Sequence, residues 1–153
     1  MAKLSIGDKA PSFSLSDQND NIVSLSDFKG KKLLLYFYPK ADTPGCTKQA
    51  CSIRDKSQEL KKLDLSAIGI SPDEPSRQMK FDKKYNLEFL LLSDPDNKVA
   101  KSYGAFGEKS MYGKIFKGII RSSFVIDEQG KILQANYKVK PLDTVPNAIN
   151  ILK

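Results

Sequence analysis

The sequence predicts an α/β fold in which a mixed central sheet is flanked by helices and preceded by an N-terminal β-hairpin. Short apolar runs at 33–38 and 65–70 are bounded by turn residues, as buried strands are. Between them, apolar residues recur at three- and four-residue spacing, which is typical of a helix joining two parallel strands. At 153 residues the chain can bury its own core, and we expect residues 1–153 to form a single domain.

The N-terminal hairpin is predicted from alternating apolar and polar residues. Residues 11–16 alternate, residues 22–25 do so less strictly, and the polar segment 17–21 has the composition of a turn. After Gly30, the run from Leu33 to Tyr38 is expected to be the central strand, buried on both faces.

A long helix from about Gly45 to Leu63 follows the central strand. Its predicted inner face consists of Cys46, Ala50, Ile53, Ser57, Leu60 and Leu63. The next strand, 65–70, would pair in parallel with the central strand through a right-handed crossover.

Two further helices are predicted in the middle of the chain. Pro75 can open the first, which carries Met79 and Tyr85. Ser93 or Asp94 can cap the second. That second helix would contain Pro95 in its first turn and Val99 and Tyr103 on one face, and it would stop at Gly104.

The last third of the chain is expected to contain a loop, a hairpin and a helix. Residues 105–118 have no clean period and are interpreted as a loop. Strands at 122–127 and 131–137 form the hairpin, and Asp143 can cap a final helix with an apolar stripe. This order of elements describes a thioredoxin-like architecture.

Composition excludes several classes of function. The net charge of +7 comes from scattered lysines without interleaved aromatic residues, which favours a solvated basic surface over nucleic-acid binding. No apolar run approaches the roughly 18 residues of a membrane-spanning helix, and the N-terminus lacks the apolar core of a secretory signal. A cytoplasmic location is therefore expected, with no membrane partner. In that reducing compartment a cysteine pair favours catalysis over a structural disulfide.

The most informative feature is the position of the two cysteines, Cys46 and Cys51. A strand that breaks at Pro39, passes through the loop Thr43-Pro-Gly45 and starts a helix at Cys46 puts a thiol at a helix N-terminus. The unpaired amides and the positive end of the helix dipole favour a thiolate there. A buried, inert cysteine remains the alternative interpretation, especially for Cys51.

The chain contains no histidine, and this narrows the chemistry. Two cysteines cannot build a Cys/His zinc site or an iron–sulfur site, so we expect no metal. A cysteine-protease mechanism lacks its usual base. Activation of the thiol must therefore be electrostatic.

The required stabilisation indicates a nearby cation. An ordinary thiol is only about 3 % thiolate at neutral pH, and making it mostly thiolate requires roughly 3.4 kcal/mol. A helix N-terminus supplies about 0.3–1 kcal/mol, or about 2 in a favourable site. Arg121, at the start of a strand that can face the central strand, is the preferred candidate, with a surface charge as its alternative role. Arg54 is interpreted as a surface or interhelical partner and Arg77 as solvated.

The spacing of the cysteines also has a geometric consequence. Residues five apart in a regular helix have Cα atoms about 8.7 Å apart. A disulfide requires less than about 7 Å. If Cys46 and Cys51 form a disulfide, the first turn or two of the helix must unwind.

These residues resemble a known family. Pro39-x-x-x-Thr43-x-x-Cys46 is similar to the active-site motif of the peroxiredoxins. Together with Cys51, the segment resembles the bacterioferritin comigratory protein, or peroxiredoxin Q, branch. Arg121-Ser-Ser-Phe124 resembles that family's arginine-bearing strand, and residues 7–15 resemble its opening segment.

The resemblance implies a thiol-dependent peroxidase and assigns a role to each matching residue. Cys46 would be the peroxidatic thiolate and Cys51 the resolving thiol that forms an intramolecular disulfide. Thr43 would orient the hydroperoxide, Arg121 would hold thiolate and peroxide oxygen, and Pro39 would shield the pocket from water.

Pro44 and Gly45 complete the predicted substrate pocket. The resemblance further implies thioredoxin or a similar dithiol as reductant and no metal or organic cofactor. Because an intramolecular disulfide needs no second chain, a monomer is expected. Ala41 and Ser123 depart from residues usual in the branch, at positions where no chemistry is expected.

Two other functions remain open from the sequence. A protein thiol–disulfide oxidoreductase is disfavoured because the Cys-x-x-Cys spacing is missing. A redox-regulated binding protein with a basic surface would react slowly with peroxide and bind its partner in a salt-dependent way.

Overall fold

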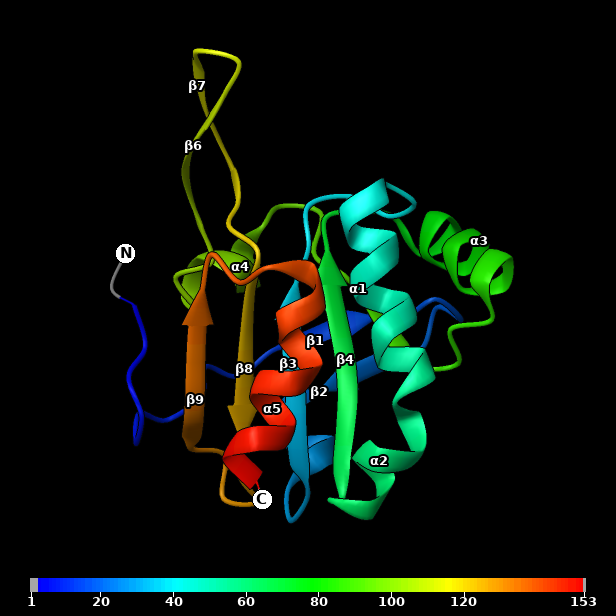
Figure 1. Ribbon diagram of the computed structural model, residues 1–153, viewed down its shortest axis with the longest axis vertical. Helices are drawn as coiled ribbons and strands as arrows, with labels where there is room; N and C mark the ends of the chain where they lie inside the picture. The colour runs from blue at the N-terminus through cyan, green and yellow to red at the C-terminus, as the bar shows by residue number, and fades with distance from the viewer. Residues whose placement is uncertain (1–2, 153) are drawn as a thin grey trace.

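The computed structural model describes residues 3–152, so the terminal residues of the predicted domain, 1, 2 and 153, lie outside the described part. A seven-stranded mixed sheet has the order β2-β1-β5-β4-β3-β8-β9, and a separate two-stranded ribbon consists of β6 and β7 (Figure 1). The strands are β1 (Ser14–Ser16), β2 (Ile22–Ser24), β3 (Lys32–Phe37), β4 (Leu65–Ser71), β5 (Leu90–Ser93), β6 (Phe106–Met111), β7 (Lys114–Ile119), β8 (Ser122–Ile126) and β9 (Ile132–Tyr137). The helices are α1 (Pro44–Asp55), α2 (Ser57–Lys62), α3 (Pro75–Tyr85), α4 (Lys98–Ser102) and α5 (Thr144–Leu152), with short 3₁₀ turns at Leu25–Phe28 and Pro141–Asp143.

The core lies on both faces of β3, as the apolar run predicted. Alternate residues of a strand point to opposite faces. Leu33, Leu35 and Phe37 pack with the N-terminal hairpin and α4. Leu34 and Tyr36 pack on the other face, where α1, α2, α3 and α5 cover the sheet. Five fully buried residues in succession therefore specify a central strand with helices on both sides.

The predicted strand pairings are confirmed. β1 and β2 form the N-terminal hairpin, β3 and β4 pair in parallel across α1 and α2, and β8 pairs antiparallel with β9. In addition, β8 pairs antiparallel with β3, a pairing that was not predicted. The mixed sheet flanked by helices agrees with the predicted fold class.

The single helix predicted for 45–63 is wrong in one respect, because the segment forms two helices. Lys56 leaves the helical conformation, with φ of −102° and ψ of 13°, and separates α1 from α2. The predicted apolar stripe is therefore interrupted at this turn. Ile53 and Leu60 are buried, Leu63 is half-buried, and Ser57, assigned to the inner face, is exposed.

The helix predicted after residue 93 is shorter than expected. Ser93 is the last residue of β5, and Pro95 lies in a turn before α4 instead of in its first turn. Asn97, and not Ser93 or Asp94, occupies the N-cap position of α4. The Asp94 carboxylate nevertheless accepts hydrogen bonds from the amides of Val99 and Ala100 in the first turn. The turn between Asp94 and α4 ends the strand before the helix can begin.

The loop predicted for 105–118 is wrong, because these residues form the β6–β7 ribbon. Tyr112 and Gly113 both have positive φ, 54° and 78°, as the two central residues of a type I′ hairpin turn do. The period-2 signal is missing because most of the ribbon's large side chains are exposed, including Tyr112 at 97 % and Ile115 at 73 %. The ribbon rises from the end of the sheet at which α1 begins (Figure 1).

Among residues 3–152, none of the helices combines the length and the apolar character that crossing a membrane requires.

Candidate active site

Cys46 lies in the first turn of α1, directly after the carboxyl end of the central strand. The helix begins at Pro44, one or two residues earlier than predicted, and Thr43 occupies the N-cap position with extended backbone. The amides of Gly45 and Cys46 have no intrahelical acceptor in this first turn. The Cys46 side chain is 1 % exposed. The predicted placement of a thiol at a helix N-terminus is therefore confirmed.

Arg121 is the cation beside this thiol, as expected. Its Nη2 lies 3.3 Å from Cys46 Sγ. The strand register explains the contact. Phe37, the last residue of β3, pairs with Ser122, the first residue of antiparallel β8. Arg121 therefore lies beside the end of β3, where the loop towards Cys46 starts.

A buried hydrogen-bond chain holds the arginine. Arg121 Nη1 donates to Gln49 Oε1 at 2.6 Å, and Gln49 Nε2 donates to Thr144 Oγ1 at 2.8 Å. Gln49 and Thr144 are both fully buried. Because Gln49 is three residues beyond Cys46 on the same helix face, it presents its amide oxygen to the guanidinium that contacts the thiol.

Gln49 and Thr144 were not among the residues predicted to form the site. One feature of the sequence could have indicated Gln49: it is a polar residue three positions after Cys46, on the helix face that is otherwise apolar as far as Ile53. Thr144 carries no comparable local signal, because it reaches Gln49 only when α5 packs beside α1.

Gly45 leaves room for the guanidinium. A Cβ atom built on Gly45 would lie 3.2 Å from Arg121 Nη2 and 3.7 Å from Pro141 Cγ. A side chain there would press against the group that contacts the thiol. Gly45, predicted to belong to the substrate pocket, thus borders the site together with Pro44, the first residue of α1.

The loop between β3 and α1 is held by two carboxylates. The Ala41 amide donates to Asp73 Oδ2 at 2.7 Å. Asp42, whose φ is 61°, accepts hydrogen bonds from Lys84 Nζ at 2.9 Å and the Tyr85 hydroxyl at 2.8 Å. These hydrogen bonds from Lys84 and Tyr85 lower the pKa of Asp42. Helix α3 and the end of β4 therefore fix the loop that leads to the thiol.

Thr43 and Pro39 lie in this same loop. The Thr43 hydroxyl donates to the Lys40 carbonyl at 2.9 Å, which leaves its oxygen lone pairs available as acceptors. Pro39 is half-buried and lines a hollow of about 380 Å³ with Pro72, Asp73 and Arg77. Their predicted roles in orienting the peroxide and excluding water stay predictions.

Tyr36 and Tyr38 lie in the same buried cluster as Cys46. Burial raises the pKa of Tyr36 well above its usual value, and the neighbouring Tyr38 phenol and the Cys46 sulfur raise it further. Burial likewise raises the pKa of Tyr38. Both phenols therefore stay neutral beside Cys46.

Cys51 lies farther along α1 and is half-buried against the same core cluster. Both cysteines are free thiols in the structure.

The two other arginines lie away from the thiol. Arg54 pairs with Asp55 at 2.9 Å and donates to the Tyr85 carbonyl, and Arg77 is exposed. Both arginines therefore have the surface or interhelical positions expected for them.

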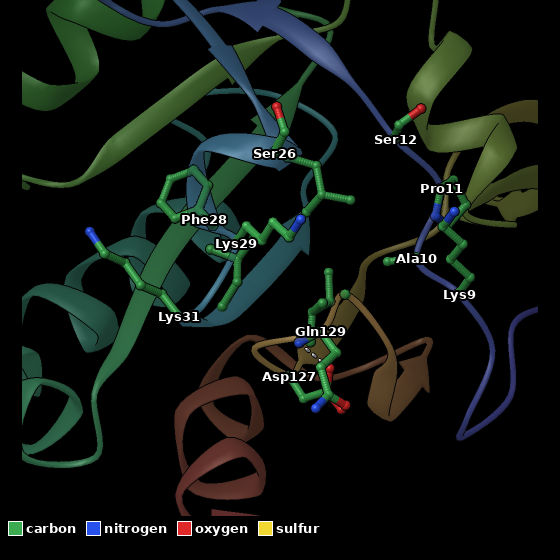
Figure 2. Close-up of a pocket in the computed structure, with 14 residues that line it drawn as sticks. Lys9, Ala10, Pro11, Ser12, Ser26, Phe28, Lys29, Lys31, Asp127 and Gln129 are labelled. Atoms are coloured by element: carbon green, nitrogen blue, oxygen red, sulfur yellow. Dashed lines mark hydrogen bonds between the residues drawn. The ribbon is translucent and has the colours of Figure 1, made fainter.

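A separate cavity of about 390 Å³ lies at the opposite end of the sheet (Figure 2). Its lining includes Leu33 at the start of β3, Ile126 at the end of β8, and the lysines Lys9, Lys29 and Lys31. It contains none of the predicted site residues.

Comparisons with known proteins agree with the resemblance. The model of the AhpC/TSA family matches residues 6–135. The putative peroxiredoxin bcp of Haemophilus influenzae is 50 % identical over 153 residues, covering 100 % of this chain and 99 % of that protein. Peroxiredoxin Bcp of Escherichia coli K12 is 52 % identical over 132 residues, covering 86 % and 85 %.

Solved structures show the same similarity. A structure of the Xanthomonas campestris bacterioferritin comigratory protein superposes with a TM-score of 0.86 at 31 % identity, covering 92 % of this chain and 89 % of that one. The sequence motif, the fold and the relatives agree, and the chain therefore belongs to the AhpC/TSA family, in its bacterioferritin comigratory protein, or peroxiredoxin Q, branch.

Proposed function

We propose that this chain is a thiol-dependent peroxidase that reduces hydroperoxides with the thiolate of Cys46. The observation that carries the proposal is the 3.3 Å contact between Arg121 Nη2 and Cys46 Sγ at the N-terminus of α1. The X. campestris relative reduces alkyl peroxides, which supports extending the substrates here from hydrogen peroxide to organic hydroperoxides.

The first step is attack of the thiolate on one peroxide oxygen. The S–O bond forms as the O–O bond breaks, giving a sulfenic acid on Cys46 and an alkoxide that takes a proton from water. Negative charge develops on the departing oxygen. Arg121 and the free amides of Gly45 and Cys46 are positioned to stabilise that charge, and Thr43 would orient the peroxide.

In the second step the Cys51 thiol attacks the sulfenic sulfur, forming a disulfide and releasing water. With α1 intact, helix geometry places the two Cα atoms about 8.7 Å apart, beyond the roughly 7 Å limit for a disulfide. The start of α1 must unwind. The break at Lys56 supports this, because α1 can open without disturbing α2.

The third step returns the enzyme to its starting state. An external dithiol, for which we propose thioredoxin, attacks the disulfide and leaves both cysteines reduced while the dithiol is oxidised. We further propose that the protein works as a monomer and as one domain, because both resolving and peroxidatic thiols lie on α1 of the same chain.

The test is rapid-mixing reaction of the reduced protein with hydrogen peroxide, followed by mass analysis. Wild type is expected to react much faster than a free thiol and to lose two hydrogens. Cys51→Ser should stop at the sulfenic acid, and Cys46→Ser should be inert. A wild-type rate equal to that of a free thiol would refute the peroxidase, and a disulfide-free product would refute the role of Cys51.

A further inference from the structure

The cavity of about 390 Å³ at the end of the sheet opposite the thiol, here called the basal cavity, has an apolar interior (Figure 2). Leu33 of β3 and Ile126 of β8 pair with each other in the sheet and lie beneath it. Pro11, Leu25 and Phe28 also line it, and because they are only half-buried they provide apolar surface that a ligand can reach. An apolar interior of this volume is typical of sites that bind small molecules.

Backbone hydrogen bonds hold the walls of the basal cavity in place. The walls come from the N-terminal segment, the first 3₁₀ turn with the loop after it, and the β8–β9 turn. Figure 2 shows the first two on opposite sides of the cavity and the third between them. The Ala10 amide donates to the Gly130 carbonyl at 2.8 Å, and the Gly30 amide donates to the Glu128 carbonyl at 2.9 Å. Because both outer walls are bonded to the β8–β9 turn, the cavity is preformed and needs no rearrangement to accept a ligand.

Three lysines line the basal cavity, Lys9, Lys29 and Lys31, and all three are exposed. A lysine lays its apolar stem along apolar surface and keeps its ammonium group in water. Lysines with this exposure therefore place positive charge at the rim of an apolar interior. Within residues 3–152, no carboxylate forms a salt bridge with any of the three.

The carboxylates near the basal cavity are bonded elsewhere or lie outside it. Asp127, the acidic residue among its lining, accepts hydrogen bonds at 2.9 Å from two backbone amides that follow it in the chain. Asp8 and Asp27 each accept a backbone amide within three residues. Glu128 is exposed and lines a neighbouring hollow that has further lysines. Three lysines against one engaged carboxylate leave the basal cavity with an excess of positive charge.

We propose that the basal cavity binds a small amphipathic carboxylate, a molecule whose apolar body lies against Leu25 and Phe28 and whose anionic group lies among the lysines. A neutral apolar molecule would leave the lysines without a partner, and a compact inorganic anion would leave the apolar surface in water. The lining contains neither Cys46 nor Arg121, so this ligand is not the hydroperoxide that the thiol would consume. The proposal therefore does not depend on the peroxidase function.

The test is an NMR titration of the reduced full chain, in which the chemical shifts of the backbone amides are followed as a probe is added. Four probes separate the two requirements. Octanoate has both the apolar body and the negative charge, octanol has the same body without charge, octylammonium has the opposite charge, and sulfate has negative charge without the body. Octanoate is expected to give saturable shifts of the amides that line the basal cavity, and to bind more tightly than octanol by about threefold or more.

Paired charge variants test the lysines directly. The double variant Lys29→Gln and Lys31→Gln should weaken the binding of octanoate by about threefold to tenfold, the range of two screened ion pairs, and leave that of octanol unchanged. The double variant Lys114→Gln and Lys117→Gln is the matched control, because both lysines are exposed, lie on the β6–β7 ribbon and remove the same charge. It should change neither affinity. Raising the salt concentration should weaken the binding of octanoate to wild type and leave that of octanol almost constant.

Several results would overturn the proposal. Octanoate that gives no saturable shifts, or shifts centred on Cys46, would show that the basal cavity is not its site. Equal affinity for octylammonium would refute selection by charge, and an equal response to sulfate would refute the role of the apolar interior. Shifts of the same amides on dilution of the ligand-free protein would assign the cavity to a second copy of the chain instead.

Discussion

Replacing Arg121 by methionine tests the central contact of the site, because methionine keeps much of the side chain's length and removes its charge. Two unit charges 3.3 Å apart interact by about 5 kcal/mol at an effective dielectric constant of 20. The guanidinium is half-buried, so solvent screens part of this energy. A charge-assisted hydrogen bond has a net value of about 1.5–3 kcal/mol, and we take this as the expected loss.

That loss corresponds to a rate reduction of about 10- to 150-fold. The assay is the second-order rate constant for hydrogen peroxide at pH 7, together with the rate of alkylation by iodoacetamide at pH 6, which reports the thiolate. We expect both rates to fall in Arg121→Met. Arg121→Lys keeps the charge but loses the fork that reaches Gln49 and the thiol together, so an intermediate rate is expected.

Urea unfolding of each variant provides the control for structural damage. A folded Arg121→Met protein that reacts within about twofold of wild type in both assays would contradict the reasoning. The thiol would then be activated by the helix N-terminus alone, and the 3.3 Å contact would be structural.

Three further changes have distinct expected outcomes. Gly45→Ala places a methyl group 3.2 Å from the guanidinium, so the rate of reaction with peroxide should fall severalfold in rapid mixing. Because a helix otherwise favours alanine over glycine by about 1 kcal/mol, we expect no loss of the free energy of unfolding in urea. A loss of unfolding free energy that accompanies the loss of rate would refute this separation. Asp42→Asn removes the charge that pairs with Lys84. Since this pairing lowers the pKa of Asp42, its stabilisation is present above the unfolded value near 4 and disappears as pH falls through the lower folded value. Wild type should therefore be more stable than Asp42→Asn at pH 7, and in thermal unfolding the difference should shrink as the pH is lowered towards 2. A pH-independent difference would contradict the assignment. Gly69→Ala would bring a methyl group within 2.8 Å of the fully buried Tyr36 ring, so we expect a loss of about 1–3 kcal/mol in urea unfolding, and no loss would show that the ring has room to move.

Local sequence was enough to predict the elements whose residues lie against a core. The run from Leu33 to Tyr38 is apolar throughout because both faces of β3 are covered. The burial of this strand can therefore be predicted from its residue types alone. The same holds for the thiol at the helix N-terminus, since Pro39, Thr43 and Pro44 interrupt the strand and begin the helix by local backbone preference.

The β6–β7 ribbon and the break at Lys56 were not predicted, for two different physical reasons. The ribbon is exposed on most of its surface, so burial imposes no alternating pattern on it. The turn at Lys56 contains no glycine or proline that would mark it in the sequence. Apolar residues recur at similar spacing before and after the turn, so their periodicity does not reveal that the helix is interrupted.

The sequence by itself determined that one cysteine would lie at a helix N-terminus and that, without histidine, a cation must activate it. Only the tertiary structure decided which groups complete the site. The register of β3 with β8 brings Arg121 to Cys46, and the packing of α5 beside α1 brings Thr144 to Gln49. These partners are 75 and 95 residues apart in the chain, and contacts over such separations depend on sheet register and helix packing, which no local pattern specifies.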